Sequence, residues 1–339
     1  MNLTYVFELL PVRELDVTTC ERDPGENHGF VPTAARTVPS LKQHVVETLL
    51  PAIEAAHGIG VYTSARSDLL EAELPLHAGR LAGSIQVNVG GEELVSQLLI
   101  LARRTVARTF GSSDIGVSSP PDSTQMIVAV FVCAAGLLRK VVVYASPISV
   151  PRMVVPSGAL HVACAIGPPR DRPHVKNIAW IRDRQDLELR SSQAMEGWPG
   201  VTCCDTLLCT ETGDLLEGLV TNFFVIVDTS GDGAGCGYKV QTAPESDVLA
   251  GVSRRKVIDA CRRLDIPVDV SCPNPLEAST WIGAFLTNSV RQVQNLDGVV
   301  CGPTNVWGLG TWEVFFAQQG GDGEQLGAKI IDHIAKHIT

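Results

Sequence analysis

Hydrophobic and polar positions alternate along the chain with two different periods, which predict strands interspersed with helices. Helical spacing indicates helices, which are expected over residues 41–57, from near residue 76, and over residues 92–110, 253–264 and 324–337. Shorter apolar runs indicate strands, which are expected at residues 3–9, 61–63, 125–133, 139–144, 160–165, 202–209, 220–227, 266–270 and 281–287. Ser40 and Ser253 are expected to cap the helices that they introduce. Strand pairs mixed with helices favour an α/β or mixed α+β fold class.

Changes in composition along the chain indicate two domains. Residues 1–40 are interrupted by Pro, Gly and charged residues, so they form a loosely patterned lead-in with one expected strand. Residues 147–158 are rich in proline and are the expected link between domains. We therefore expect a smaller N-terminal α/β domain over residues 1–150 and a larger C-terminal α/β domain over residues 151–339.

Composition and charge exclude several classes of protein. Hydrophobic residues make up 45% of the chain and charged residues 19%, which is a globular composition. The longest apolar run, residues 126–138, is too short to cross a bilayer, which takes about 20 residues, so no membrane partner is expected. The net charge of −10 argues against a nucleic-acid partner. A small anionic ligand remains compatible with it, because such a ligand needs only local cations.

The cysteines and glycines suggest neither a metal site nor a dinucleotide site. The ten cysteines are scattered, without a C-x-x-C pair or a histidine at zinc-finger spacing. Reduced thiols and a cytosolic location are the default expectation, because residues 1–10 also lack the pattern of a signal peptide. Residues 231–237 alternate glycine, but no helix follows them. They are therefore interpreted as a hairpin loop and not as a dinucleotide-binding motif.

Two charged residues stand in apolar surroundings that can change their chemistry. Lys176 is flanked by apolar residues, and such a lysine is either a surface residue or a desolvated amine suited to Schiff-base chemistry. Glu217 precedes a glycine and a strongly apolar strand, which suggests a buried carboxylate with a cationic partner. Each is a candidate catalytic or cofactor-binding residue.

Three further features together could bind a phosphate group. Val252 and Ser253 follow a glycine at the start of an expected helix, where unpaired N–H groups and the helix dipole favour anions. Thr287, Asn288 and Ser289 are small polar residues after a buried strand and could form a second wall. Arg80 would supply full positive charge in a bidentate fork. A lysine, a carboxylate and a phosphate cradle are the protein groups that pyridoxal 5'-phosphate requires.

The order of these motifs resembles the class IV aminotransferases, which are the fold-type IV pyridoxal-phosphate enzymes. The family includes branched-chain aminotransferase, D-amino acid aminotransferase and aminodeoxychorismate lyase. The stretch EGLVTNFF at residues 217–224 is the most specific similarity. The others, in chain order around it, are residues 60–66 with 76–81, the Lys176 segment, residues 248–254 and residues 284–289. The chain looks closest to a plant-type branch of this family.

The resemblance implies a two-domain fold of the D-amino acid aminotransferase type, with the cofactor at the domain interface. It implies a homodimer that moves an amino group between an amino acid of branched-chain or D type and a 2-oxo acid. In this reading Lys176 forms the Schiff base and shuttles the proton, and Tyr62 lines the active site beside it. Glu217 holds the pyridine nitrogen protonated. The phosphate is bound by the remaining candidates, which are Arg80, Val252, Ser253, Asn288 and Ser289.

Two alternatives remain open on the sequence, and both concern the substrate side of the site. One is a lyase of the aminodeoxychorismate type, which uses the same lysine and cofactor. The other is a catalytically silent relative that serves as a binding module.

The family's N-terminal hairpin is expected to be missing, and Asn295-Leu296 replaces a common Pro-Val. No motif assigns an arginine for the substrate carboxylate, for which Arg66 is a candidate.

Overall fold

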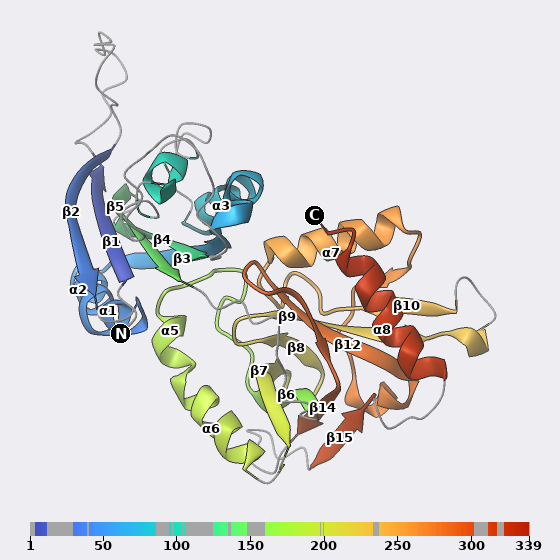
Figure 1. Ribbon diagram of the computed structural model, residues 1–339. Helices are drawn as coiled ribbons and strands as arrows, with labels where there is room; N and C mark the ends of the chain where they lie inside the picture. Colours follow the sequence, from blue (N-terminus) through green and yellow to red (C-terminus); the bar gives the residue numbers. More distant parts are fainter. Residues whose placement is uncertain are drawn as a thin grey trace. The chain divides into compact units, whose positions relative to one another are not determined.

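The structure is a computed structural model, and it divides into two compact units (Figure 1). One unit comprises residues 1–150 with 175–182, and the other comprises residues 151–174 with 183–339. The structure describes residues 4–11, 30–38, 41–85, 95, 98–103, 105, 125–134, 137–147, 160–196, 198, 200–232, 237–301, 311–316 and 322–338. The proline-rich link at 148–158 and the Ser40 cap lie outside these residues.

The first unit is built on an antiparallel sheet of five strands in the order β2-β1-β5-β4-β3. These strands are β1 (Thr4–Pro11), β2 (Phe30–Val38), β3 (Ile59–Arg66), β4 (Gln125–Ala134) and β5 (Leu137–Pro147). The expectation of one strand in the lead-in is wrong, because the described residues of 1–40 contain two strands, β1 and β2, which pair antiparallel. A long connection separates these strands in sequence, so local pattern did not reveal their pairing.

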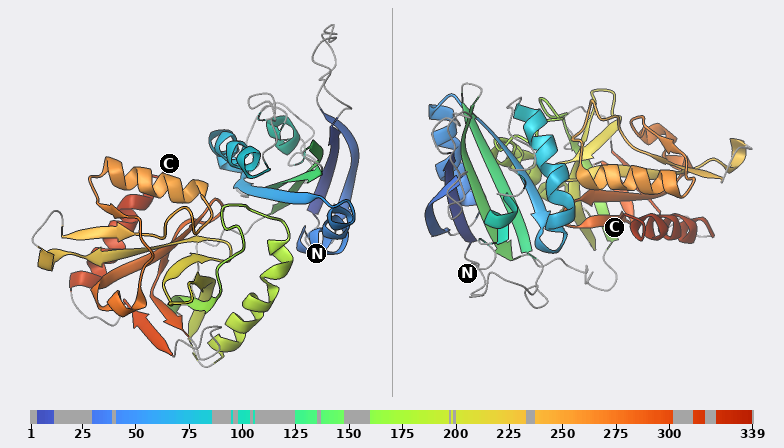
Figure 2. Two further views of the ribbon diagram at one scale, coloured as in Figure 1. Left: turned by 180° about the vertical axis from the view of Figure 1, so that it is seen from behind. Right: turned by 90° about the horizontal axis from the view of Figure 1, so that it is seen from above.

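Helices cover both faces of this sheet (Figure 2). On one face lie α1 (Leu41–His44), a π-helical turn (Val45–Leu49) and α2 (Leu50–Ala55), and on the other lies α3 (Leu70–Ile85). Along β4, Val128 and Val130 pack with the first group, and Ala129 and Phe131 pack with the second. Burial on both faces explains why β4 and β5 are continuous apolar runs.

The helices of this unit depart from the expected bounds where prolines occur. The helix expected over residues 41–57 ends at Ala55 and contains the π turn, in which the Leu50 N–H donates to the Val45 carbonyl. Pro51 has no N–H to continue the regular ladder at this point. The helix expected from residue 76 begins at Leu70 and includes Pro75. Of the helix expected over 92–110, the described residues 95, 98–103 and 105 are helical.

Residues 175–182 pack with the first unit, although they follow the start of the second unit in sequence. Their backbone pairs with β3, since the Tyr62 N–H donates to the Lys176 carbonyl at 3.0 Å and the Ile178 N–H to the Gly60 carbonyl at 2.9 Å. Gly60 permits this close approach, because a Cβ there would lie 2.4 Å from Ile178 Cγ2. The short helix α5 (Trp180–Asp183) follows. Lys176 is thus placed by the edge strand of the first sheet.

The second unit contains a curled mixed sheet in the order β11-β10-β9-β8-β7-β6-β14-β15, with β12 pairing with β9 and β13. Strand β6 is parallel to β7 and β14, and β10 is parallel to β11, whereas the other pairs are antiparallel. The strands are β6 (Leu160–Gly167), β7 (Val201–Cys209), β8 (Leu215–Gly218), β9 (Asn222–Asp228), β10 (Tyr238–Gln241), β11 (Val268–Asp269), β12 (Trp281–Asn288), β13 (Gln292–Leu296), β14 (Gly298–Cys301) and β15 (Trp312–Phe315).

Three helices pack on this sheet, and two of them share one face of β9 and β12 (Figures 1 and 2). Helix α6 (Gln185–Met195) packs on β6 and β7, whereas α7 (Val252–Arg263) and α8 (Asp322–Ala335) cover Phe224 and Phe285. The rings of these two phenylalanines stack with their centroids 4.8 Å apart. The next residues along the strands, Phe223 and Leu286, face the opposite side, where they pack in the core with β6 and β7.

Several local expectations in the second unit are settled by these elements. Strands β9 and β10, on either side of the glycine-rich segment, pair antiparallel as the hairpin interpretation predicts, and residues 233–236 lie outside the described residues. The expectation that Ser253 caps α7 is wrong, because Gly251 is the N-cap and Ser253 lies inside the first turn. None of the helices in the described residues is long and apolar enough to span a membrane. The described cysteines form no disulfides, and the cytosolic location stays a prediction.

Candidate active site

The first unit brings Lys176 and Tyr62 together at the edge of its sheet. Lys176 is half-buried between the buried residues Val175 and Ile178. Its Nζ lies 4.9 Å from the centroid of the Tyr62 ring, and Tyr62 is 8% exposed. A lysine over an aromatic face is stabilised as a cation. The two residues that the sequence proposes as catalytic are therefore neighbours.

Behind them lies a buried polar chain that joins β3 to α3. Arg80 Nη2 donates to Thr63 Oγ1 at 3.0 Å, and Thr63 Oγ1 lies 2.6 Å from His77 Nδ1. His77 Nε2 in turn lies 3.6 Å from Glu73 Oε2. Burial lowers the pKa of His77 to about 4, with Glu73 opposing this shift and the charges of Arg80 and Lys176 adding to it. His77 is therefore neutral near pH 7, between two cations.

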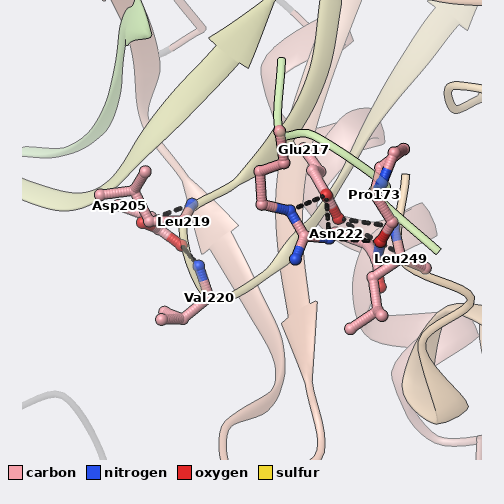
Figure 3. Close-up of polar contacts among 8 residues, drawn as sticks. Pro173, Asp205, Glu217, Leu219, Val220, Asn222 and Leu249 are labelled. Atoms are coloured by element: carbon pink, nitrogen blue, oxygen red, sulfur yellow. Dashed lines mark hydrogen bonds and ion pairs between the residues drawn. The ribbon is translucent and has the colours of Figure 1, made fainter. Parts of the chain in front are cut away.

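In the second unit, Glu217 is buried at the point where β8 meets β9 (Figure 3). Its Oε1 accepts two bonds from Arg170, from Nε at 2.9 Å and from Nη2 at 2.6 Å. Its Oε2 accepts from the Leu249 N–H at 3.0 Å and from Asn222 Nδ2 at 3.3 Å. Burial raises the pKa of Glu217, and the charge of Arg170 opposes that rise most strongly. The buried cationic partner expected from the sequence is thus Arg170.

Asp205 on β7 holds the turn between Glu217 and Asn222 (Figure 3). Its carboxylate accepts from the N–H groups of Leu219 and Val220, both at 3.2 Å, and from Thr221 Oγ1 at 2.7 Å. Burial raises the pKa of Asp205, and these donors oppose the shift. A Cβ on Gly218 would lie 2.4 Å from Asp205 Oδ2, so glycine is required for the carboxylate to approach this turn.

The N-terminus of α7 presents unsatisfied polar groups beside Asn222. No side chain caps this helix, and Ser253 Oγ in its first turn is buried without a hydrogen-bond partner. Thr287 Oγ1 is likewise buried and without a partner. Thr287 lies opposite Asn222 in the β9–β12 register, and a Cβ on Gly251 would lie 2.1 Å from Asn222 Oδ1. Both orphaned hydroxyls therefore lie beside the strand position of Asn222.

The candidates Asn288 and Ser289 are engaged in the turn after β12. Asn288 Oδ1 accepts from the N–H groups of Val290 at 3.0 Å and Arg291 at 2.7 Å. The Ser289 carbonyl accepts from Gln292 Nε2 at 3.0 Å. Thr287 offers the unsatisfied buried hydroxyl instead, since a buried polar group without a partner is costly. Its signal in the sequence was its position at the end of a buried strand, directly before these two residues.

The buried groups fit a phosphate ester better than a metal ion. Two orphaned hydroxyl donors beside an uncapped helix N-terminus match the needs of a phosphate, which takes N–H and O–H donors. The chain also supplies a buried carboxylate and an amine, which are Glu217 and Lys176. No group of three or more metal-binding side chains occurs among the described residues. Arg66, the candidate for a substrate carboxylate, is paired with Asp68 through two bonds of 2.9 and 2.6 Å.

The chain matches a known protein family in sequence and resembles several solved structures in fold. Residues 140–297 match the family model for amino-transferase class IV. The structure resembles a fold IV-transaminase from Curtobacterium pusillum, with a TM-score of 0.55, 16% identity, and coverage of 98% of this chain and 99% of that one. A mutant branched-chain amino acid aminotransferase from Thermobaculum terrenum gives a TM-score of 0.55 at 16% identity, covering 98% and 93%.

A third solved structure is similar over nearly the whole chain. The branched-chain amino acid aminotransferase of T.th., solved with pyridoxamine 5'-phosphate, gives a TM-score of 0.52 at 16% identity, covering 92% of this chain and 93% of that one. No curated protein sequence matches the chain. At these identities the structural likeness establishes the fold, and it confirms the predicted mixed α/β fold of type IV.

Proposed function

Residues 140–297 belong to the class IV amino-transferases, and from this premise we propose that the chain is a pyridoxal-phosphate-dependent aminotransferase. It moves an amino group between an amino acid, of branched-chain or D type, and a 2-oxo acid. The observation that carries the proposal is the uncapped N-terminus of α7 with the orphaned hydroxyls of Ser253 and Thr287. A phosphate group would satisfy both of them. The same resemblance supports a homodimer.

The residues proposed to bind the phosphate supply positive charge and neutral donors. Arg80 supplies a guanidinium, which binds phosphate oxygens in a bidentate manner. The Val252 and Ser253 amides, the Ser253 hydroxyl and the Thr287 hydroxyl supply neutral donors at a helix N-terminus, where the dipole favours an anion. We assign Thr287 the role that the sequence gave to Asn288, because the Asn288 side chain already accepts two backbone N–H bonds.

Glu217 would hold a proton on the ring nitrogen of the cofactor. Its four donors favour the ionised carboxylate, which is the form that can accept a bond from a protonated ring. A carboxylate has about four acceptor positions, and all four are used here. The longest of these bonds is the 3.3 Å contact from Asn222, so Glu217 Oε2 is the oxygen that would most readily accept a further donor. Asn222 keeps its second bond, to the Leu249 carbonyl at 2.9 Å.

Lys176 would carry the covalent and proton-transfer chemistry. When bound, pyridoxal phosphate supplies an aldehyde carbon for an amine and a protonated ring that accepts the electron pair of a broken Cα–H bond. Lys176 Nζ would be the amine that holds the cofactor covalently and, as a neutral amine, the base that would move the proton. Tyr62 orients the lysine side chain, since its ring lies beneath Nζ.

The two alternatives predict different products from the same bound cofactor. A lyase of the aminodeoxychorismate type releases pyruvate without needing an amino acceptor, whereas an aminotransferase requires a 2-oxo acid. A silent binding module binds the cofactor or its phosphate and turns over nothing. A screen of L- and D-amino acids with 2-oxo acids, followed by analysis of the products, separates these three outcomes.

The first experiment is to record the visible spectrum with pyridoxal phosphate, before and after borohydride reduction. We expect an absorption band that reduction abolishes and a cofactor fixed to the peptide that contains Lys176, identified by mass spectrometry. The Lys176→Ala variant should lose the band and the turnover while remaining folded. Lys336→Ala, which alters an exposed lysine of α8's C-terminal end, is the matched control and should behave as the wild type. A protein that takes up no cofactor would contradict the proposal.

A further inference from the structure

The buried polar chain of the first unit extends well beyond the residue that would contact phosphate. Glu73 is 0% exposed, His77 1% and Thr63 2%. Glu73, His77 and Arg80 follow one another at spacings of four and three along α3, so they share one face of the helix. Thr63 projects from β3 between two of them, as its contacts with Arg80 and His77 show. Burying this many polar side chains requires that their hydrogen bonds be well ordered.

The groups on either side of His77 indicate the direction of each hydrogen bond in this chain. Arg80 is a donor only, so Thr63 Oγ1 accepts its bond. Glu73 Oε2 lies 3.6 Å from His77 Nε2, and because a carboxylate accepts only, it favours the imidazole tautomer with its proton on Nε2. In that tautomer Nδ1 is unprotonated and accepts from the Thr63 hydroxyl, 2.6 Å away. The low pKa of His77, about 4, agrees with this neutral form.

These hydrogen bonds restrict the Arg80 guanidinium through one atom, Thr63 Oγ1. A hydroxyl that donates to His77 directs its lone pairs away from the imidazole and toward Arg80. Thr63 is β-branched, so its side-chain rotamer is restricted and its oxygen is a fixed point of attachment. The long side chain of Arg80 would otherwise sample many rotamers, which costs free energy when a ligand orders it. Anchoring Nη2 therefore orders the guanidinium before any ligand arrives.

We propose that Thr63 and His77 are positioning residues that hold Arg80 in the orientation with which it binds the cofactor's phosphate. The inference rests on the proposed function, because it takes the phosphate as the ligand of Arg80. Thr63 acts directly on the guanidinium, and His77 acts through Thr63 by accepting its hydrogen. Glu73 fixes the imidazole tautomer from the far side. None of the three needs to touch the cofactor.

The test measures how much the phosphate group contributes to binding. Pyridoxamine 5'-phosphate and pyridoxamine differ only in the phosphate, and neither forms a Schiff base with a lysine. The dissociation constant of pyridoxamine divided by that of pyridoxamine 5'-phosphate, measured by fluorescence titration or calorimetry, isolates the phosphate contribution. We expect Thr63→Val, which has the same shape without the hydroxyl, to lower this ratio about tenfold, the usual effect of a hydrogen bond to a charged group. Thr63→Ser, which keeps the hydroxyl, should retain most of the ratio.

A second pair of variants tests the role of His77 in case Thr63→Val does not fold. His77→Asn keeps an acceptor near the position of Nδ1 and should preserve the ratio, whereas His77→Leu should lower it. Equal loss of affinity for both ligands would indicate a general structural role and overturn the proposal, as would an unchanged ratio in Thr63→Val. A wild-type ratio near one would instead show that Arg80 and the α7 N-terminus bind no phosphate. That outcome would contradict the proposed function itself.

Discussion

At the scale of single residues, the Arg170–Glu217 pair is the most constrained interaction of the candidate site. The Arg170 and Glu217 side chains are 6% and 4% exposed, and their closest contact is 2.6 Å. Removing one partner from such a pair leaves an uncompensated buried charge, which is far more costly than losing an exposed ion pair. The pair therefore determines both the charge of the site and the stability of the surrounding strands.

We expect Arg170→Met to lower the free energy of unfolding by about 3–5 kcal/mol at pH 8, measured by urea denaturation. Burial raises the pKa of Glu217 and Arg170 opposes the rise, so the variant raises this pKa further above that of the unfolded chain. The folded variant then holds a proton that the unfolded chain has lost, and its stability falls as pH rises above the unfolded value. The deficit should consequently be smaller at pH 5 than at pH 8.

Arg172→Met is the matched control for this experiment. Arg172 lies two residues further along the same loop, its side chain is 56% exposed, and its distance to Asp171 is 3.8 Å. We expect its effect to stay within about 0.5 kcal/mol. The double variant Arg170→Met with Glu217→Gln should recover part of the lost stability, because no buried charge remains. If Arg170→Met and Arg172→Met have equal free energies of unfolding, the buried pair contributes nothing to stability.

At the scale of elements, the junction of α7 with β9 depends on a glycine. Gly251 is the N-cap of α7 and has an extended backbone, with φ −68° and ψ 138°. It requires no unusual backbone conformation, so the reason for glycine is space. A Cβ would lie 2.1 Å from Asn222 Oδ1 and 3.3 Å from its Cγ. The side chain of Asn222 thus occupies the volume that a larger residue at 251 would need.

We expect Gly251→Ala to displace Asn222 and to loosen the bonds from Asn222 to Glu217 and Leu249. The strain should lower the free energy of unfolding by about 1–3 kcal/mol and weaken the affinity for pyridoxamine 5'-phosphate. Gly79→Ala is the control, because Gly79 lies inside α3 and a Cβ there meets nothing within 4 Å. It should raise stability by about 0.5–1 kcal/mol. Thermal denaturation with and without ligand measures both effects, and similar behaviour of the two variants would refute the steric account.

At the scale of the whole molecule, the residues proposed to bind the cofactor belong to two different units. Arg80 and Lys176 belong to the first unit, whereas Glu217, Ser253 and Thr287 belong to the second. A ligand that binds only the native arrangement stabilises it by mass action, by about 2.7 kcal/mol at a concentration one hundred times its dissociation constant. Stabilisation by such a ligand therefore reports whether both units participate in one site.

We expect pyridoxamine 5'-phosphate to raise the melting temperature of the wild type, and both Arg80→Met and Ser253→Ala to reduce that rise. Each variant removes a phosphate donor, one in each unit. The controls are Arg103→Met in the first unit and Ser192→Ala in the second, both of which alter exposed side chains. The measurement is differential scanning calorimetry at several ligand concentrations. If only Ser253→Ala reduces the rise, the ligand does not use Arg80, and the proposed role of Arg80 is excluded.

Sequence patterns predicted those features that depend on neighbouring residues in the chain. The runs that became β4 and β5 were recognisable because burial on both faces requires apolar residues at consecutive positions. The motif around Glu217 predicted a buried carboxylate with a cationic partner, since an apolar strand follows it directly. Lys176 stood out because apolar residues flank it, whereas Tyr62 was implied by the family resemblance, and in the structure Lys176 Nζ lies 4.9 Å from the centroid of the Tyr62 ring.

By itself, then, the sequence determined the periods of the strands and helices, the fold class and the identities of Lys176 and Glu217. Only the tertiary structure decided which residues surround them. Arg170 lies 47 positions from Glu217, and β1 finds β2 and β5 across long connections. Lys176 joins the first unit through the edge of β3. Such partners depend on the order of strands in a sheet, which is set by packing between distant segments and has no local periodicity.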